Sequence, residues 1–506
     1  MQTTLVRGPL VFHDRAINNE ATPAIGMAYL AGYAIDRGHD VTIVDSVSEA
    51  LNHIWPMPDF AGIACQGLTF EDAIARIPEN SQVIGISIMF SGEWPVQRKF
   101  LEKIRECFPK AVIIAGGEHA TALSEYVLRD CPSLDACVMG EGEHTFFEIL
   151  EKVSENESIY DLNGIAYLDA SGAFIRNETQ PRVRDLSQIP WPHWPDGYLE
   201  KFWAAGKSFG IGTERDMPIM GSRGCPYQCT FCSNPQMWTT RYTLRDIDDL
   251  ISEIKHYIDK YNITSLQFYD LTAITKKRWT VEFCKKLLEE DIKISWSLPS
   301  GTRSEALDVE TLSLLKETGC TYLVYAPESG SPRILEKIKK RISLDGLTES
   351  IINAKNLGIT TRANLIIGFP GETRKDMLKT IFYGFKLAMR GVEEVPINLY
   401  SAYPGSEIFK HLIKDNRVTL NDDYFLSLTS INSDFLAINP MVVNEIVSPR
   451  GLAIYRVVAM GTNYLLGYLI NPSRIIRTIR NVFGDSHVAA TVLEHRLKDS
   501  MRRGKT

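Results

Sequence analysis

The chain has 506 residues, of which 44% are hydrophobic and 23% are charged, and its formal net charge is −7. This length allows two large domains with room for a small third. The slight negative charge leaves no basic excess that would indicate nucleic acid as a partner. The first residues have neither the charged start nor the apolar core of a signal peptide, and the nine cysteines form no disulfide framework. We therefore expect a protein of the reducing cytoplasm.

Strands and helices alternate over the first part of the chain. Short apolar runs predict strands at residues 4–6, 41–44, 83–88, 111–115 and 136–139. Helical patterns lie between them, at residues 26–37, 70–77, 96–107 and 122–129. Continuous apolar runs are typical of strands that helices cover on both faces. The prediction is a doubly wound parallel sheet, which binds ligands at the carboxyl ends of its strands.

A hairpin and a proline-rich stretch follow this region. The hairpin is predicted at residues 164–168 and 173–176, with its turn at Ser171 and Gly172. Residues 189–197 contain too much proline for a helix or an interior strand. We interpret them as a linker whose aromatic side chains join two domains.

From about residue 218 the alternation resumes with longer units. Strands are predicted at residues 219–220, 265–269, 294–298, 322–325, 364–367 and 396–400. Helices are predicted at residues 246–260, 280–289, 309–318, 344–357 and 374–389. Six such units indicate a partial (β/α)6 barrel with its functional loops at the carboxyl ends of the strands.

These patterns divide the chain into four parts. Residues 1–155 form the doubly wound domain, 156–217 the hairpin and linker, 218–415 the partial barrel, and 416–506 a mainly helical C-terminal region. Residues 451–470 are largely apolar but are interrupted by Arg456, which argues against a transmembrane helix. The last 34 residues, 473–506, carry eight Lys or Arg against three Asp or Glu. This end either touches anionic lipid or forms a packed helix with a solvated face.

Three cysteines, Cys225, Cys229 and Cys232, follow the first predicted barrel strand in a CxxxCxxC pattern. The spacing differs from the two separated ligand pairs of structural zinc sites. Three thiolates can hold three corners of a cubane iron–sulfur cluster and leave the fourth iron open for a small molecule. The other six cysteines are interpreted as small buried hydrophobic residues; they are Cys65, Cys107, Cys131, Cys137, Cys284 and Cys320.

Residues 224–233, including Phe231 before the third cysteine, resemble the signature of the radical S-adenosylmethionine (radical SAM) superfamily. The resemblance implies a 4Fe-4S cluster on the three cysteines, with SAM on the open iron and the backbone of Phe231 facing adenine. It also implies a 5′-deoxyadenosyl radical that removes hydrogen from an unactivated carbon, and an electron donor such as flavodoxin or ferredoxin.

Later strand ends resemble the SAM-binding motifs of the same superfamily. The residues concerned are Asp270, then Glu328, Ser329 and Gly330, and then Gly368 and Gly371. Asp270 either steers the SAM amine or a substrate group, or caps the following helix. Glu328 either accepts from ribose hydroxyls or the amine, or forms a structural salt bridge. The turn at 368–373 either contacts adenosine or is a plain turn. Arg303 either binds a carboxylate of SAM or substrate, or forms a surface pair.

The N-terminal region resembles the cobalamin-binding domain that is fused to many radical SAM enzymes. Four patches carry the resemblance: residues 23–26 with Leu30 and Ala31, then 38–41, 115–121 and 140–145. Glycines at strand ends let a backbone lie against a large planar ring. The implied cobalamin-site residues are Gly116, Gly117, Glu118, His119, Gly140 and Gly142, with Glu118 where the family commonly has proline.

The Asp-x-His-x-x-Gly motif that supplies a lower histidine ligand to cobalamin does not occur in this sequence. The resemblance then implies either cobalamin bound without that ligand or a degenerate domain that binds none. His119 and His144 are expected to lie in loops, where a histidine is more often solvated or capping than ligating.

Three functions follow from these patterns. The first is a cobalamin-dependent radical SAM methyltransferase that methylates an unactivated carbon of a small molecule or lipid. The second is another radical SAM reaction, such as the ring formation of anaerobic magnesium-protoporphyrin ester cyclases, or coupling or desaturation of a lipid. The third is a non-catalytic iron–sulfur protein, which has no need of the SAM-site motifs. Trp94, Trp238, Tyr242 and Trp296 indicate either room for an apolar or planar substrate or core packing.

Overall fold

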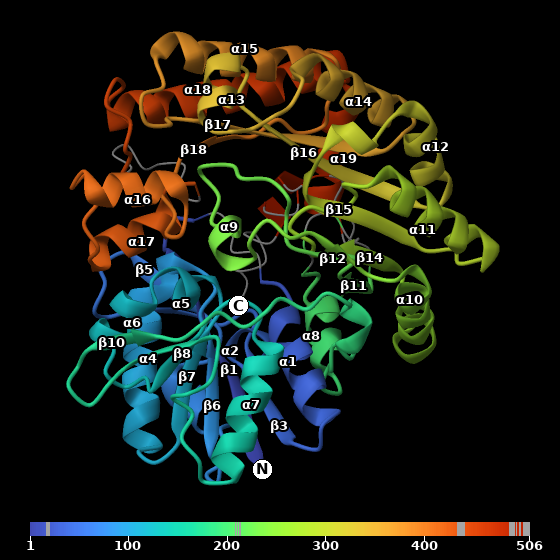
Figure 1. The fold of residues 1–506 in the computed structure, drawn as a ribbon. Coiled ribbons are helices and arrows are strands. Elements are labelled where there is room, and N and C mark those ends of the chain that lie inside the picture. The colour runs from blue at the N-terminus through green and yellow to red at the C-terminus, as the bar shows by residue number, and fades with distance from the viewer. Residues whose placement is uncertain are drawn as a thin grey trace. The chain divides into compact units, whose positions relative to one another are not determined.

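The structure, a computed structural model, describes residues 1–16, 21–207, 209, 211, 214–432 and 441–484, and residues 491, 493, 494, 497 and 498. It is a mixed α/β protein with two compact units (Figure 1). The first unit comprises Met1–Ala205, Phe231–Thr240 and Ala402–Ser430. The second comprises Gly206–Thr230, Arg241–Ser401 and Ile431–Thr506. The chain passes from the second unit into the first between Thr230 and Phe231, inside the cysteine motif.

The first unit contains a seven-stranded sheet in the order β10-β9-β8-β7-β6-β1-β3. Its parallel strands are β1 (Gln2–Arg7), β3 (Asp40–Asp45), β6 (Val83–Ser87), β7 (Val112–Gly116) and β8 (Ala136–Val138). The hairpin of β9 (Ile165–Leu168) and β10 (Phe174–Arg176) adds two antiparallel strands. The strand order reverses direction between β1 and β6, as in doubly wound sheets. The predicted fold class and the predicted hairpin are confirmed.

Helices accompany this sheet, and α1, α3, α4 and α6 among them lie where the apolar periodicity predicts helices. They are α1 (Ile25–Ile35), α2 (Ser46–Glu49), α3 (Phe70–Ile74), α4 (Trp94–Cys107), α5 (Glu118–Ala122), α6 (Ser124–Asp130), α7 (Glu143–Ser154) and α8 (Tyr198–Ala204). In α4 the residues Phe100, Leu101 and Ile104 are fully buried at helical spacing, which anchors the helix in the core. One core cluster joins Leu5 of β1 to Phe146 and Ile149 of α7.

A second, antiparallel sheet in the first unit is not predicted by the sequence analysis. It has the order β2-β5-β4, with β2 (Leu10–His13), β4 (Ile54–Pro56) and β5 (Ile63–Gln66). These strands are only three or four residues long, which is too short for alternation to be recognised.

Residues 189–197 pack within the first unit, because the His193 N–H donates to the Ala28 carbonyl at 2.9 Å. Their role as a linker between two domains stays a prediction.

The second unit contains a six-stranded sheet in the order β11-β14-β15-β16-β17-β18. All neighbours are parallel and follow one another along the chain, as in a partial barrel. The strands are β11 (Asp216–Ile219), β14 (Ser265–Phe268), β15 (Ser295–Thr302), β16 (Cys320–Glu328), β17 (Thr360–Ile367) and β18 (Ile397–Leu399), and a small ribbon pairs β12 (Ser222–Arg223) with β13 (Thr243–Leu244). This confirms the six predicted strands.

The barrel helices connect successive strands (Figure 1). They are α10 (Ile247–Tyr261), α11 (Lys277–Glu289), α12 (Val309–Glu317), α13 (Pro332–Lys337), α14 (Leu344–Asn356) and α15 (Arg374–Met389). Several begin at a capping side chain: Asp246 accepts from the Asp249 N–H, and Thr373 forms a capping box with Asp376.

Trp94 in the first unit and Trp296 in the second are both fully buried, which favours core packing for these two aromatics.

The C-terminal region is helical, as predicted. It contains α17 (Asp422–Ser430) of the first unit and α18 (Pro449–Ile470) and α19 (Ser473–Phe483) of the second. Two helices of the first unit, α9 (Asn234–Met237) and α16 (Glu407–Lys414), precede this region. Among the described residues, no helix has both the length and the apolar character needed to cross a membrane. Most of the predicted basic tail after residue 484 lies outside the described residues.

Candidate active site

The cysteine motif begins directly after β12, with Cys225 and Cys229 in the second unit and Cys232 in the stretch that belongs to the first. All three are partly buried and none forms a disulfide. Burial raises the pKa of the Cys225 and Cys229 thiols, while the positive charges of Lys340 and Arg303 act in the opposite direction. These cations favour the thiolate, which is the form that binds iron.

No three His, Cys, Asp or Glu side chains among the described residues are placed to hold one metal ion. A cubane cluster makes a different demand, because each of its thiolates binds a different iron atom. The donor set of three thiols, with two cations acting on the thiols of Cys225 and Cys229, therefore fits a cluster better than a single ion.

Asp270, at the end of β14, holds the chain just before the cysteines. Its buried carboxylate accepts from the Gly221 N–H at 3.0 Å and from the Ser222 hydroxyl. Burial raises the pKa of Asp270 to about 6, and these hydrogen bonds oppose the increase. Asp270 does not cap the next helix, because α11 begins at Lys277 without a side-chain cap. A contact of Asp270 with SAM stays a prediction.

Two further bonds fix the cysteine segment inside the second unit. The Thr230 N–H donates to the Ile338 carbonyl at 3.1 Å, just beyond α13. The Arg303 guanidinium lies over the Tyr227 ring, 3.7 Å from its centroid, and donates to the Arg341 carbonyl at 2.7 Å. Arg303 also pairs with Glu305 at 2.9 Å, yet its Nε is buried without a hydrogen-bond partner among the described residues. A buried unpartnered N–H beside the cysteine segment fits an anionic ligand group, such as a carboxylate.

Glu328 ends β16 in a backbone conformation that only a few non-glycine residues adopt, with φ at +63°. Its carboxylate is buried and pairs with Lys340 at 3.1 Å, so the salt bridge anticipated for it is present. Burial raises the pKa of Glu328, and the Lys340 and Arg303 charges oppose that increase. Backbone strain at a buried carboxylate is typical of functional sites.

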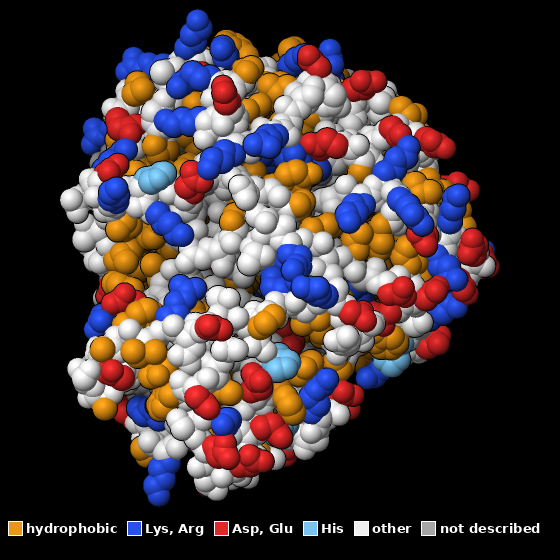
Figure 2. Space-filling view, viewed as in Figure 1, with side chains coloured by type: hydrophobic (Ala, Val, Ile, Leu, Met, Phe, Trp, Pro, Cys, Tyr) orange, Lys and Arg blue, Asp and Glu red, His pale blue; other side chains and the backbone are white. Residues whose placement is uncertain are grey.

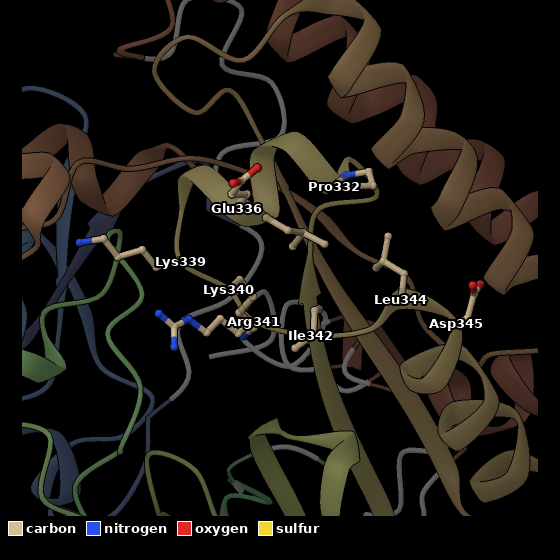
Figure 3. A pocket seen from close by; sticks show the side chains of 9 residues that line it. Pro332, Glu336, Lys339, Lys340, Arg341, Ile342, Leu344 and Asp345 are labelled. Atoms are coloured by element: carbon tan, nitrogen blue, oxygen red, sulfur yellow. The ribbon is translucent and has the colours of Figure 1, made fainter.

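A cavity of about 740 Å³ lies beside this salt bridge, between α13 and α14 (Figure 3). Its lining includes Lys339, Lys340 and Arg341, of which Lys340 also contacts Glu328. The only acids in the lining are Glu336 and Asp345. Three cations in succession give the cavity a positive side that suits a carboxylate or phosphate.

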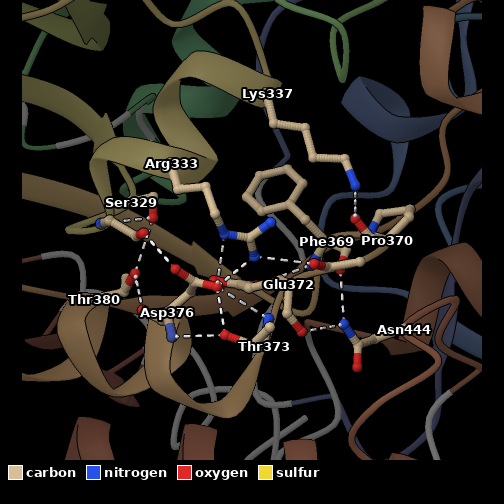
Figure 4. A network of polar contacts seen from close by, with 12 residues as sticks. Ser329, Arg333, Lys337, Phe369, Pro370, Glu372, Thr373, Asp376, Thr380 and Asn444 are labelled. Carbon is tan, nitrogen blue, oxygen red and sulfur yellow. Dashed lines mark hydrogen bonds and ion pairs between the residues drawn. The ribbon is translucent and has the colours of Figure 1, made fainter.

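The predicted turn after β17 is closed by its own glutamate. Glu372 is fully buried and accepts from the Gly368 N–H at 2.6 Å and the Phe369 N–H at 3.0 Å. Burial raises the pKa of Glu372 to about 7. Asn444 donates to the carbonyls of Phe369 and Glu372 from outside the turn (Figure 4). Gly368 and Gly371 have φ of +93° and +68°, so the turn needs glycine at both positions.

Ser329 and Gly330 contact α15 rather than open space. The Ser329 hydroxyl lies 3.0 Å from the Thr380 hydroxyl, and Ser331 donates to Asp376 at 2.6 Å (Figure 4). A Cβ on Gly330 would lie 2.6 Å from the Lys379 carbonyl oxygen. The glycine therefore allows β16 to end against α15, and its role toward SAM stays a prediction.

In the first unit, the predicted glycine patches lie at the ends of β7 and β8. Gly117 has φ of +108°, and a Cβ there would lie 2.5 Å from the Ile88 carbonyl oxygen. Gly116 and Gly26 have open space instead, since the nearest atom to a Cβ on Gly116 is 4.0 Å away and none lies within 4 Å of one on Gly26. Met89 and Phe90, just past β6, are exposed apolar side chains. An open glycine surface beside exposed apolar groups fits a large planar ligand.

These glycine loops also hold the stretch that follows the cysteines. Glu118 accepts from the Ser233 hydroxyl, and Gln236 donates to the Ala122 carbonyl at 3.4 Å. Gly140 has φ of +76° and approaches the Met237 carbonyl. Gly142 precedes α7, where a Cβ would lie 3.2 Å from Leu30. Residues 231–240 are thus fixed by the ends of β7 and β8.

The expectation that His119 and His144 lie in loops is wrong, because they lie in α5 and α7. His119 is fully buried, with Nδ1 2.9 Å from the Ser91 hydroxyl and its ring between Trp94 and Phe425. Burial lowers the pKa of His119 to about 3, so the ring is neutral. His144 is exposed on the surface of α7. Neither geometry resembles an open metal ligand, and a part for His119 in the cobalamin site stays a prediction.

Two family models match the chain. The Radical SAM superfamily model matches residues 219–383, and the B12 binding domain model matches residues 19–150. The two matches do not overlap, and together they cover more than half of the chain. The chain belongs to the radical SAM superfamily, in the branch with a B12 binding domain.

Relatives of this radical SAM protein include both methyltransferases and cyclases. An uncharacterized methyltransferase of Pyrococcus horikoshii is 29% identical over 421 residues, covering 82% of this chain and 84% of the relative. An anaerobic magnesium-protoporphyrin IX monomethyl ester cyclase of Rubrivivax gelatinosus is 26% identical over 396 residues, covering 77% of this chain and 66% of the relative.

The fold is also that of a solved radical SAM protein. The radical S-adenosylmethionine methyltransferase TsrM from Kitasatospora setae, with cobalamin and a [4Fe-4S] cluster bound, superposes with a TM-score of 0.66. The match covers 100% of this chain and 99% of TsrM at 14% sequence identity. At this identity the likeness establishes the shared architecture.

Several polar residues near the predicted site were not predicted from the sequence. Lys340 and Arg341 line the cavity, and Ser233 joins the post-cysteine stretch to Glu118. Three consecutive basic residues at 339–341, shortly after the strand-end motif at 328–331, were a visible signal for the first two. Ser233 gave no such signal, because its partner lies 115 positions away along the chain.

Proposed function

We propose that this protein is a cobalamin-dependent radical SAM methyltransferase that methylates an unactivated carbon of a small molecule or lipid. Cys225, Cys229 and Cys232 would hold the 4Fe-4S cluster, and Asp270, Glu328, Ser329, Gly330, Gly368, Gly371 and the backbone of Phe231 would surround SAM. Gly116, Gly117, Glu118, His119, Gly140 and Gly142 would form the cobalamin side. When bound, the cluster with SAM supplies a carbon-centred radical and cobalamin supplies the methyl group.

One observation carries this proposal. The continuous stretch of residues 221–237 is hydrogen-bonded to the barrel unit in its first half and to the B12-type unit in its second half. Its first half is held by Asp270 and by the Ile338 carbonyl in the barrel unit. Its second half is held by Glu118 and Ala122 in the B12-type unit. The residues that would bind the cluster therefore belong to a segment that the loops of both predicted cofactor sites fix in place.

The chain's own side chains have defined tasks in this reaction. Asp270 holds Gly221, just before the cysteine motif, and Arg303 lies over Tyr227, within the motif. Both residues therefore orient the cysteine segment. The Arg303 Nε and the Lys340 ammonium present positive charge to an anionic group of SAM or substrate. The turn at 368–373 is closed by Glu372, so its backbone is in place before any ligand binds.

The test is anaerobic reconstitution of the full chain with iron and sulfide, followed by dithionite and SAM. The expected result is release of 5′-deoxyadenosine, which Cys229→Ala abolishes together with cluster absorbance. Cys107→Ala is the matched control, because Cys107 is an exposed cysteine outside the motif. Release by the Cys229→Ala variant, or no release by a wild-type protein with intact cluster, would contradict the proposal.

Two further measurements separate the reaction types. Protein purified with cobalamin should show a corrin absorption band, and a SAM methyl label should enter the product. Transfer of hydrogen without transfer of the label would favour the second function, ring formation or another radical rearrangement, for which the cyclase relative is the supporting observation. A protein that binds the cluster but not SAM would support the third.

We also propose the setting in which this enzyme works. A flavodoxin or ferredoxin would deliver the electron, since the reaction needs a low-potential donor. The enzyme would act in the cytoplasm, where an oxygen-sensitive cluster is protected.

A further inference from the structure

Helix α19 of the second unit turns two of its polar side chains toward the protein. Arg474 is buried, donates to the Gly391 carbonyl at 2.7 Å and pairs with Glu393 at 3.0 Å. Asn481 is buried as well and donates to Glu494 at 2.9 Å. An amphipathic helix on a soluble protein normally places its apolar face inward and its charges outward. In α19 Arg474 and Asn481 lie inward instead, although Arg480 is exposed and Val482 is buried.

The opposite face of α19 is apolar and exposed. Ile475, Ile479 and Phe483 follow the helical spacing i, i+4, i+8, and Ile476 lies beside Ile475. Ile476 is 73% exposed and Phe483 71% exposed. Large apolar side chains that gather on one exposed face indicate a surface that another apolar phase covers.

The longer helix α18 repeats the same arrangement. Arg456 and Asn463 are buried, and Asn463 donates to the Val395 carbonyl at 2.8 Å. Between residues 451 and 473 Arg456 is the one charged residue, so the exposed surface of α18 carries a charge only at Arg450, in its first turn. That surface exposes Ile454, Val457, Val458, Leu465, Leu469 and Ile470.

Cations border this apolar surface on α15, which packs against α18. Five exposed basic residues lie on or directly after α15: Arg374, Lys375, Lys379, Lys386 and Arg390. None of them forms an ion pair with a described residue, and the one acid of the helix, Asp376, is buried and bound to Arg333. Leu378, Phe382 and Met389 are exposed between them. Figure 2 shows Lys and Arg side chains together with hydrophobic ones over α15.

We propose that the exposed faces of α15, α18 and α19 bind the surface of an anionic lipid bilayer. The apolar side chains would enter the boundary between headgroups and acyl chains, and the α15 cations would contact anionic headgroups. The charge pattern selects this partner, because the surface offers unpaired cations and no exposed acid on the three helices. The helices lie on the bilayer rather than cross it, in keeping with their length and composition. This inference does not depend on the proposed methyl transfer.

The test is flotation of the purified full-length protein with vesicles of phosphatidylcholine, with and without phosphatidylglycerol. Binding is expected to the anionic vesicles and to weaken with salt. Ile476→Ser with Phe483→Ser should reduce binding at least tenfold, because both side chains are exposed and the substitutions leave the fold intact. Each of Lys375→Glu, Lys379→Glu and Lys386→Glu should reduce it by roughly fivefold or more.

Matched controls keep the outcome interpretable. Leu288→Ser with Val309→Ser removes two exposed apolar side chains from α11 and α12 and should leave binding unchanged. Iron content and melting temperature of all variants should equal those of the wild type. Failure to bind anionic vesicles would overturn the proposal. A concentration-dependent dimer that the α19 variant dissociates would overturn it too, because a second copy would then cover the surface.

Discussion

The two units fix their strand-end loops by different physical means. In the barrel unit, buried carboxylates accept backbone N–H groups: Asp270 holds Gly221, and Glu372 holds Gly368 and Phe369. In the B12-type unit, glycines allow close backbone approach as well, as at Gly117, where no side chain fits beside the Ile88 carbonyl. Carboxylate-held loops respond to pH, whereas glycine-held loops depend on steric fit alone. Substitutions in the two kinds of loop separate these two mechanisms.

The largest effect is expected for Gly117→Ala. The new Cβ would lie 2.5 Å from the Ile88 oxygen, on a residue whose φ is +108°. Left-handed strain and overpacking together should cost roughly 2–4 kcal/mol and lower the melting temperature. Cobalamin retention should fall with it, since Gly117 lies in the predicted site.

Gly172→Ala is the matched control for this substitution. Gly172 has φ of +80° in the exposed hairpin turn, with no atom within 4 Å of a Cβ. It should cost only about 1 kcal/mol and leave cobalamin binding unchanged. Equal effects of the two substitutions would show that the Ile88 contact has no part in shaping the loop.

The next effect is expected for Glu372→Ala. The substitution leaves the Gly368 and Phe369 N–H groups buried without their acceptor, which should cost about 1–3 kcal/mol. Hydrogen exchange in residues 366–373 should speed up, and SAM-dependent 5′-deoxyadenosine release should weaken. Glu372→Gln retains an acceptor oxygen and should lose less than about 1 kcal/mol at pH 8. Exchange as fast in the Gln variant as in the Ala variant would contradict the acceptor role.

Much of this architecture could be predicted from the sequence, because its signals are local. Continuous apolar runs identified the strands of both parallel sheets, and 3.6-residue spacing identified helices such as α4 and α15. The three cysteines and the 368–373 turn were visible for the same reason, since each motif lies within ten residues.

The remainder depends on partners that are distant in sequence. The hydrogen bond from Gly221 to Asp270 spans 49 positions, and the one from Ser233 to Glu118 spans 115. The periodicity of α19 marks it as amphipathic but does not say which face is inside. That choice is made by Glu393, Glu494 and the Gly391 carbonyl, which take up its polar groups.

A further effect of the same carboxylate is the pH dependence that Glu372 contributes. Burial raises its pKa from 4.5 to about 7, so the folded state takes up the proton more readily than the unfolded state. The contribution of Glu372 to stability therefore increases as the pH falls from about 7 toward 4.5 and decreases again as the pH rises. Relative to Glu372→Gln, which cannot titrate, the wild type should gain on the order of 2–3 kcal/mol between pH 8 and pH 5. Melting temperatures of both proteins across this range measure the difference, and parallel curves would contradict it.

The smallest effect is expected at Glu118, a carboxylate among the glycine loops. Burial raises the pKa of Glu118, and the hydrogen bond from Ser233 opposes that increase. Ser233→Ala removes the donor, so the carboxylate becomes neutral more readily and the loss of stability stays near 0.5–1.5 kcal/mol. Cobalamin retention should fall severalfold, because the stretch 231–240 loses a tie to α5. Ser171→Ala breaks a similar bond to Asp169 on the exposed hairpin and should change neither quantity. Equal cobalamin retention by the two variants would show that the hydrogen bond from Ser233 to Glu118 has no part in shaping this side of the site.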